Sequence, residues 1–326
     1  MTGTRWSCSE IVRPLLKGAL VAAVAVAGAP DPAPAQDDLD DACVAAGSAR
    51  CAVAAAAVRL IHPRIGTALW GGNPVPGTAS TLGMRLGSRP RISVSGRIAL
   101  VPVELPPLLD AGRNDGSGAL LPGVGVRATI GVLNGFSPMA TVGGVFSVDA
   151  IAGLSWAALP SGDGFRDDAW GWAVGLRVGA LRESFTLPGV SLTGSWARST
   201  DVRFGDPEGA ATDGALEGPI SNLNAILAVT KRIARIGVTA GAAWDRYAGD
   251  VRVSYASVPG GPVSRLDAEA VTRRWSGFVN ATYTSLVFHT TVELGWQQAP
   301  QPRDLPATVA LDLAHLWVAF AFRVSI

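Results

Sequence analysis

Charged residues are scarce in this sequence of 326 residues: Asp, Glu, Lys and Arg make up 16% of it, whereas 48% is hydrophobic. Soluble domains usually carry about 25% charge, and disordered chains carry more. The mean hydropathy of +0.29 is typical of helical membrane proteins, yet no stretch after residue 28 reaches the ~18 uninterrupted apolar residues that a spanning helix needs. The composition therefore excludes an ordinary soluble domain, a disordered chain and a bundle of membrane helices.

The first 35 residues have the pattern of a cleavable export signal. Arg5, Arg13 and Lys17 precede a short apolar run over residues 18–29, and a small-residue A-x-A sequence ends at Ala35. A basic start, a short apolar run and small residues at the cleavage site define a secretory signal peptide. The run is too short for an uncleaved membrane anchor. We therefore expect residues 1–35 to be removed by cleavage after Ala35.

The mature chain has no excess of either charge. Removal of residues 1–35 takes away three of the 27 basic and two of the 26 acidic residues, which leaves 24 of each sign. A neutral balance offers no electrostatic footprint for a nucleic acid, so we expect no such partner.

Cysteine is rare as well, and only Cys43 and Cys51 remain after cleavage. An even count in an exported protein favours a disulfide. On one continuous helix the two residues would lie ~12 Å apart, too far for a bridge. A bond between them requires a turn near Gly47 and Ser48; unpaired or metal-binding thiols are the alternatives.

From residue 89 onward, apolar residues occupy alternate positions. Ile92, Val94 and Ile98, for example, alternate with Ser93, Ser95 and Arg97, which predicts a strand with one apolar and one polar face. Most such runs have about the 9–11 residues that a tilted strand needs to cross a bilayer. The ten runs are Arg91–Val101, Val124–Val132, Phe146–Trp156, Trp170–Ala180, Val190–Phe204, Leu223–Val229, Ile236–Trp244, Trp275–Tyr283, Phe288–Trp296 and Leu316–Ile326.

The links between these runs alternate in length. Long polar links cover residues 105–119, 159–169, 205–219, 257–269 and 298–308, and short ones cover 134–142, 185–188, 231–235 and 284–287. Long loops on one side and tight turns on the other are typical of a barrel in the outer membrane.

Aromatic residues gather on the apolar face near the strand ends, as interfacial girdles do. The tryptophans lie toward the long loops, except Trp196, which is near the middle of its run. The other aromatic residues lie toward the short turns. The predicted girdle residues are Trp156, Trp170, Trp172, Trp196, Trp244, Trp275, Trp296, Tyr283, Phe288 and Phe322.

Across residues 89–326 the sequence resembles the bacterial outer-membrane β-barrel proteins. Its last run, Leu316–Ile326, looks like the assembly signal of that family, with Ile326 where an aromatic residue is usual. The resemblance implies an all-β fold, a transmembrane antiparallel up-and-down barrel in the outer membrane. It also implies contact with lipid and lipopolysaccharide, and recognition of the last strand by the assembly machinery. This architecture serves many functions, and no motif identifies a subfamily.

The segment before the barrel is open to two interpretations. Residues 42–60 are alanine-rich and predict a helix in a periplasmic segment over residues 36–64, and the barrel would then cover residues 65–326. If Ile65–Trp70 and Thr81–Leu86 form a hairpin, the barrel has twelve strands, which we prefer because it accounts for the apolar residues of 81–86. Otherwise the barrel has ten strands, and residues 71–87 form a plug or a periplasmic extension.

The polar face of the strands predicts a charged lumen. Its residues fit a small porin-like channel that passes or binds small polar solutes, which is our first hypothesis. They also fit ion pairs that fill a closed structural or surface-interaction barrel. The candidate lining residues are Arg97, Arg127, Asp149, Arg177, Asp245, Arg274, Asn280, His289, Glu293, His315 and Arg323.

An outer-membrane hydrolase is a less favoured hypothesis. His289 and Glu293 are four residues apart on one strand, hence ~13 Å apart, too far for an acid–base pair or a shared metal ion. The long loops contain no histidine and the chain has no Gly-x-Ser-x-Gly motif. We therefore expect no enzymatic activity, no metal and no cofactor. Solvation explains the basic cluster of Lys231, Arg232 and Arg235 in a short turn.

Overall fold

The computed structural model describes residues 38–85, 89–105, 117–137, 144–205, 214–256, 261–299 and 316–326. The predicted signal peptide, its cleavage after Ala35 and the candidate His315 lie outside these residues.

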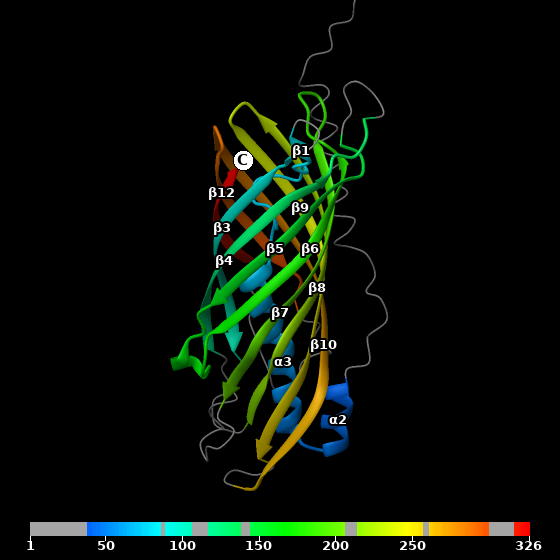
Figure 1. The fold of residues 1–326 in the computed structure, drawn as a ribbon. Helices are drawn as coiled ribbons and strands as arrows, with labels where there is room; N and C mark the ends of the chain where they lie inside the picture. The colour runs from blue at the N-terminus through cyan, green and yellow to red at the C-terminus, as the bar shows by residue number, and fades with distance from the viewer. Residues whose placement is uncertain are drawn as a thin grey trace, which may run out of the picture.

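Ten antiparallel strands close into a barrel, in which each strand pairs with its sequence neighbours and the last pairs with the first (Figure 1). The predicted all-β barrel is thereby confirmed. The strands are β3 (Ile92–Leu105), β4 (Ser117–Leu133), β5 (Ser147–Ala157), β6 (Ala169–Leu181), β7 (Gly189–Gly205), β8 (Gly214–Ile233), β9 (Ile236–Ala256), β10 (Val263–Ser285), β11 (Phe288–Gln297) and β12 (Leu316–Ser325). A short 3₁₀-helix, η1 (Ser161–Asp163), lies between β5 and β6.

The preferred twelve-strand interpretation is wrong. Ile65–Trp70 is the last part of helix α3 (Ala49–Trp70). Strand β1 (Met84–Arg85) pairs only with β2 (Arg89–Pro90), in a separate two-stranded sheet that is not part of the barrel wall. The reason is burial: a helix satisfies its backbone hydrogen bonds internally, whereas a buried strand without neighbours leaves them unpaired. The barrel wall therefore begins at Ile92 and not at residue 65. Among the described residues, neither helix is long and apolar enough to cross a membrane.

Two helices joined by a disulfide precede the barrel. Helix α2 (Asp38–Ala46) is followed by Gly47, whose φ of +62° suits glycine. Ser48 then caps α3, because its side chain accepts a hydrogen bond from the backbone N–H of Cys51. This turn brings Cys43 and Cys51 together in a disulfide, with 5.3 Å between their Cα atoms. The pairing uses the turn that the sequence predicted.

The outer face of the barrel changes character along its length. On β9 the outward row begins with the exposed Ile236 and Val238 at the short-turn end and reaches Trp244. Beyond Trp244 the same row continues with the exposed Asp250 and Arg252. An apolar outward row suits lipid and a charged one suits water, so Trp244 marks the boundary between the two.

The inner face changes in the opposite sense. On β9 the inward row is polar at Thr239 and Asp245, and it becomes apolar at Val251 and Val253. The apolar inward residues of the loop end pack around α2 and α3 in one hydrophobic core. The short-turn half of the barrel thus has an apolar outer face, which suits lipid, and a polar inner face. The loop-end half has a charged outer face, which suits water, and an apolar inner face.

Charges of alternating sign cross the outer face of the loop-end half. In register across β7 to β10 lie Arg203, Glu217, Arg252 and Asp267. Arg203 Nε donates to Glu217 and Arg252 Nε donates to Asp267, each at 2.8 Å. The hydrogen bond with Glu217 raises the pKa of Arg203. We call these four residues the charged row.

The predicted girdle residues lie on the outward face. Trp172 and Trp196 meet edge to face with ring centroids 4.8 Å apart. At the short-turn end Phe288 stacks on Phe322 with centroids 5.6 Å apart. The face therefore carries aromatic rings on both sides of an aliphatic band, the arrangement that membrane interfaces favour.

Candidate functional site

Residues 38–85, the N-terminal segment that we also call the lumen segment, run through the whole barrel from the loop end to the short-turn end (Figure 1). At the loop end Arg50 Nη1 donates to the carbonyl of Ala256, the last residue of β9, at 2.8 Å. At the other end Arg91 N–H donates to Gly83 at 3.3 Å, just before β3. Residues 38–64 therefore lie at the loop end and inside the barrel. The expected separate segment over residues 36–64 is therefore not separate from the barrel in its described part: the apolar inner wall of the loop-end half packs against Leu39 and Cys43 of α2 and encloses α3.

Helix α3 fills the barrel. Every residue from Ala54 to Leu69 is buried. The helix lies against β3, β4, β5, β6, β8, β9 and β10, and Thr67 also contacts β11 through Gln297. A helix that is buried on all sides needs apolar or small residues all round, which the alanine-rich sequence of α3 supplies. The candidate lumen is therefore occupied by this chain's own segment.

Wall glycines allow α3 to approach closely. A Cβ atom on Gly123 of β4 would collide with the carbonyl of Ala68. A Cβ atom on Gly171 of β6 would lie 2.7 Å from the ring of Trp70. Such contacts are shorter than real Cβ atoms make, so these two positions require glycine as long as α3 stays where it is.

The end of α3 meets a buried charged cluster. Glu293 on β11 lies 3.9 Å from Arg97 Nε on β3. Its Oε2 accepts hydrogen bonds from the backbone N–H of Asn73 and from Asn280 Nδ2, both at 3.1 Å. Arg127 on β4 donates to the carbonyls of Trp70 at 2.9 Å and Asn73 at 3.4 Å. The wall thus binds the backbone where the helix ends.

A second buried cluster holds the segment nearer the short turns. Asp149 on β5 pairs with Arg177 on β6, whose Nη2 lies 2.6 Å from Oδ2. The same carboxylate accepts the backbone N–H groups of Leu82 and Gly83. Asp149 and Arg177 are 0% and 1% exposed, so the bonds from Leu82 and Gly83 complete the coordination of a carboxylate that water does not reach.

Two further polar contacts lie near the middle of the barrel. Asp245 on β9 accepts from Asn222, Asn224 and Ser276 on the neighbouring strands. Gln297 Nε2 on β11 donates to Thr67 Oγ1 of α3 at 2.9 Å. The first contact joins strands to each other, and the second joins the wall to the helix.

The structure places all the described candidate residues on the inner wall, and it separates His289 from Glu293. His289 shares a hydrogen bond of 3.0 Å with Thr284, whereas Glu293 belongs to the Arg97 cluster. The buried candidates are Arg97, Arg127, Asp149, Arg177, Asp245, Arg274, Asn280, His289, Glu293 and Arg323.

Several residues of the site were not predicted. Asn73 and Gly72 follow α3, and a Cβ atom on Gly72, whose φ is +79°, would collide with Glu293. Trp317 is buried, and the Arg97 guanidinium lies 5.2 Å from its ring centroid. The adjacent glycines at residues 71 and 72 and the inward phase of Trp317 in its strand were the available signals.

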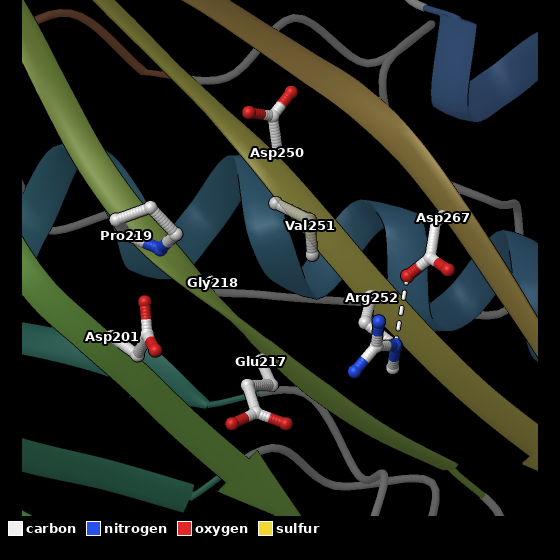
Figure 2. A pocket seen from close by; sticks show the side chains of 8 residues that line it. All are labelled: Asp201, Glu217, Gly218, Pro219, Asp250, Val251, Arg252 and Asp267. Atoms are coloured by element: carbon white, nitrogen blue, oxygen red, sulfur yellow. Dashed lines mark hydrogen bonds and ion pairs between the residues drawn. The ribbon is translucent and has the colours of Figure 1, made fainter.

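A hollow interrupts the outer wall of the loop-end half, as Figure 2 shows. The ladder between β8 and β9 opens between Glu217 and Ser221, where Pro219 has no N–H to donate. The resulting cavity of about 330 Å³ is lined by four carboxylates and by Arg252, which Asp267 engages. No group of three or more His, Cys, Asp or Glu suited to a metal ion occurs in the described part of the chain.

A closed barrel of antiparallel strands, with a lipid-compatible band between two aromatic rings, decides the architecture. The chain has the fold of the outer-membrane β-barrel proteins. No protein-family model and no curated protein matches its sequence.

Several solved structures resemble this barrel at low similarity. The outer membrane protease OmpT from Escherichia coli has a TM-score of 0.33 and 11% identity over 76% of this chain and 98% of its own. The translocator domain of the autotransporter NalP from Neisseria meningitidis has a TM-score of 0.38 and 13% identity, over 72% and 87%. The Pseudomonas putida toluene transporter TodX has a TM-score of 0.33 and 9% identity, over 79% and 97%.

Proposed function

We propose that this outer-membrane barrel is closed by its own N-terminal segment and serves as a structural or surface-interaction barrel without an open pore. The observation that carries the proposal is the burial of α3 from Ala54 to Leu69 inside the barrel wall. The small channel expected from the sequence requires this helix to leave, whereas a closed barrel requires no rearrangement.

The polar contacts of the lumen support a resident segment. Backbone groups of Trp70, Asn73, Leu82 and Gly83 bind charged side chains of the wall. Removal of a hydrogen-bonded partner leaves buried polar groups unsatisfied, at about 1–3 kcal/mol each. Because the contacts lie in both the middle and the short-turn part of the barrel, departure of the segment would break them together.

The surface that such a barrel offers lies at its loop end. The disulfide-linked helices and the charged row are both found there. We place the interaction surface of the protein on this rim, beyond the Trp244 boundary.

A cysteine pair tests whether the segment occupies the lumen. Thr81 and Ser147 share a side-chain hydrogen bond, so T81C/S147C should oxidise to a disulfide that joins the segment to β5. The matched control T81C/T282C should stay reduced, because β10 lies opposite β5 in the order of the ten strands. Heat-modifiable gel mobility checks that each variant folds.

Planar-bilayer conductance then tests closure. We expect no discrete steps from the folded wild-type protein and none from the oxidised T81C/S147C variant. Steps from the wild type that vanish on oxidation would show a gated channel and overturn the proposal. Steps that persist in the oxidised variant would show a path beside the segment, and would overturn it as well.

A further inference from the structure

A cationic cavity opens at the short-turn end of the barrel, whereas the charged row lies at the loop end. It has a volume of about 250 Å³ and is lined by Arg91, Arg182, Arg232 and Arg323, together with His289. Glu183 is the one carboxylate among the lining residues. The cavity lies between the wall and residues 77–82 of the lumen segment.

The lining arginines lack enough counter-charges. Arg323 is 4% exposed, and its Nε has no hydrogen-bond partner in the described part of the chain. The Nε of Arg182 is also buried without a partner there. The Glu183 carboxylate accepts the backbone N–H of Arg232, which does not neutralise a guanidinium.

No side chain of the described neighbouring segments supplies the missing charge. Asp149, deeper in the lumen, is engaged by Arg177 and by two backbone N–H groups. Residues 86–88 and 138–143, which flank this end in the sequence, contain no Asp or Glu. Like charges held together in a partly enclosed site repel one another unless an anion joins them.

The side chains that line the cavity indicate which class of anion it would bind. Guanidinium groups bind phosphate oxygens through paired, charge-assisted hydrogen bonds. Thr78, Ser80, Thr81 and Ser325 add hydroxyl groups to the lining. The volume is below that of an ordinary drug-sized pocket, which fits a small ligand and excludes a polymer chain inside the cavity.

We propose that this cavity binds a small phosphate-class oxyanion that enters from the short-turn side. The bound anion would contact both the wall, through Arg323 and Arg232, and the lumen segment, through Thr78 and Thr81. Binding would therefore link residues 78–81 of the lumen segment to the barrel wall near the short turns. The inference goes beyond the closure of the barrel, since a conducting barrel could hold the same site.

Calorimetric titration of the detergent-solubilised full chain with inorganic phosphate and with pyrophosphate tests the site. We expect saturable binding that weakens as the salt concentration rises. R232Q and R323Q should each weaken binding by about tenfold or more, since each removes a charge-assisted hydrogen bond. Arg232 is exposed, so R232Q keeps the test valid if R323Q does not fold.

Arg235 provides the matched control. It lies three residues after Arg232, in the turn that follows β8. Its side chain is exposed, donates to the Tyr283 hydroxyl at 3.3 Å and does not line the cavity. R235Q should bind phosphate as the wild type does. Equal losses in R232Q and R235Q would mean diffuse attraction to a basic rim and would overturn the site, as would absence of saturable binding.

A lipid headgroup offers the same phosphate chemistry, and nanodiscs separate the two sources. Phosphate should bind equally well in discs of phosphatidylcholine alone and in discs that contain phosphatidylglycerol. If phosphate binds only when phosphatidylglycerol is absent, and R232Q abolishes the competition, the headgroup occupies the site and the free-anion proposal is overturned.

Discussion

Arg127 on the barrel wall donates a hydrogen bond of 2.9 Å to the carbonyl of Trp70, the last residue of the lumen helix. The last carbonyls of a helix have no intrahelical partner and carry partial negative charge. The guanidinium therefore satisfies an orphan acceptor and favours the helix dipole at the same time.

Substitution of Arg127 should loosen the end of α3. We expect R127M to lower the free energy of local opening of residues 62–70 by about 1.5–3 kcal/mol, the value of a hydrogen bond to a charged group. Hydrogen exchange of that peptide measures the effect. Arg198 on β7 is exposed, and R198M should leave exchange unchanged; equal protection in R127M and the wild type would contradict the role of Arg127.

The Asp149–Arg177 pair should behave as a buried ion pair. D149N leaves the buried guanidinium without its counter-charge, which costs about 3–5 kcal/mol of stability. Urea unfolding of the barrel in lipid vesicles measures this loss. The double variant D149N/R177M should recover part of it, because no charge is then left unpaired. A double variant as unstable as the sum of both single variants would contradict direct coupling.

Two glycines on β4 should differ sharply although they are two residues apart on the same face. G123A places a methyl group against the backbone of Ala68, and overpacking typically costs about 1–3 kcal/mol. G125A meets its nearest atoms at an ordinary 3.5 Å and should be tolerated. Protease digestion of the helix segment compares the two variants. If both resist digestion equally, α3 does not lie against Gly123.

An arginine scan of β10 locates the membrane boundary. Val279 and Val271 share the outward row of β10, on either side of Trp275. V279R should cost about 2–4 kcal/mol of stability, the penalty near the middle of a bilayer, and V271R about 0–1 kcal/mol. Unfolding in vesicles measures both. Similar costs at the two positions would remove the lipid boundary that we assign to the tryptophans.

Loss of the disulfide should affect the helices more than the barrel. C43S/C51S removes a cross-link across a short loop, which contributes about 2–3 kcal/mol in the chain-entropy account. We expect faster proteolysis within α2 and unchanged heat-modifiable mobility of the barrel. A barrel that fails to fold without the bond would show instead that the helix pair is needed for assembly.

The lipid-facing parts of the strands could be predicted from the sequence because one neighbour, the bilayer, selects apolar residues at every second position. The loop-end parts could not. Beyond Trp244 the apolar residues move to the inward row, so the alternation shifts by one position. The expected loops over residues 205–219 and 257–269 are therefore partly strand, in β8 and β10.

The position of α3 inside the barrel could not be predicted from the sequence, for a different reason. Four consecutive alanines at residues 54–57 suit a helix in many surroundings, and nothing in them indicates an enclosing wall. The glycines that accept the helix, Gly123 and Gly171, have the same appearance as glycines in any curved strand. Sequence could predict the charged inner residues but not the backbone groups of Trp70 and Asn73 that they bind.

The disulfide between Cys43 and Cys51 restricts the direction in which the lumen segment can leave the barrel. At the loop end it joins two helices side by side, whereas the wall farther in encloses only one helix. The cross-linked pair is too wide to follow α3 through the barrel toward the short turns. Withdrawal of the segment is thereby restricted to one exit, the loop end, and a pull from the short-turn side would seat it more firmly.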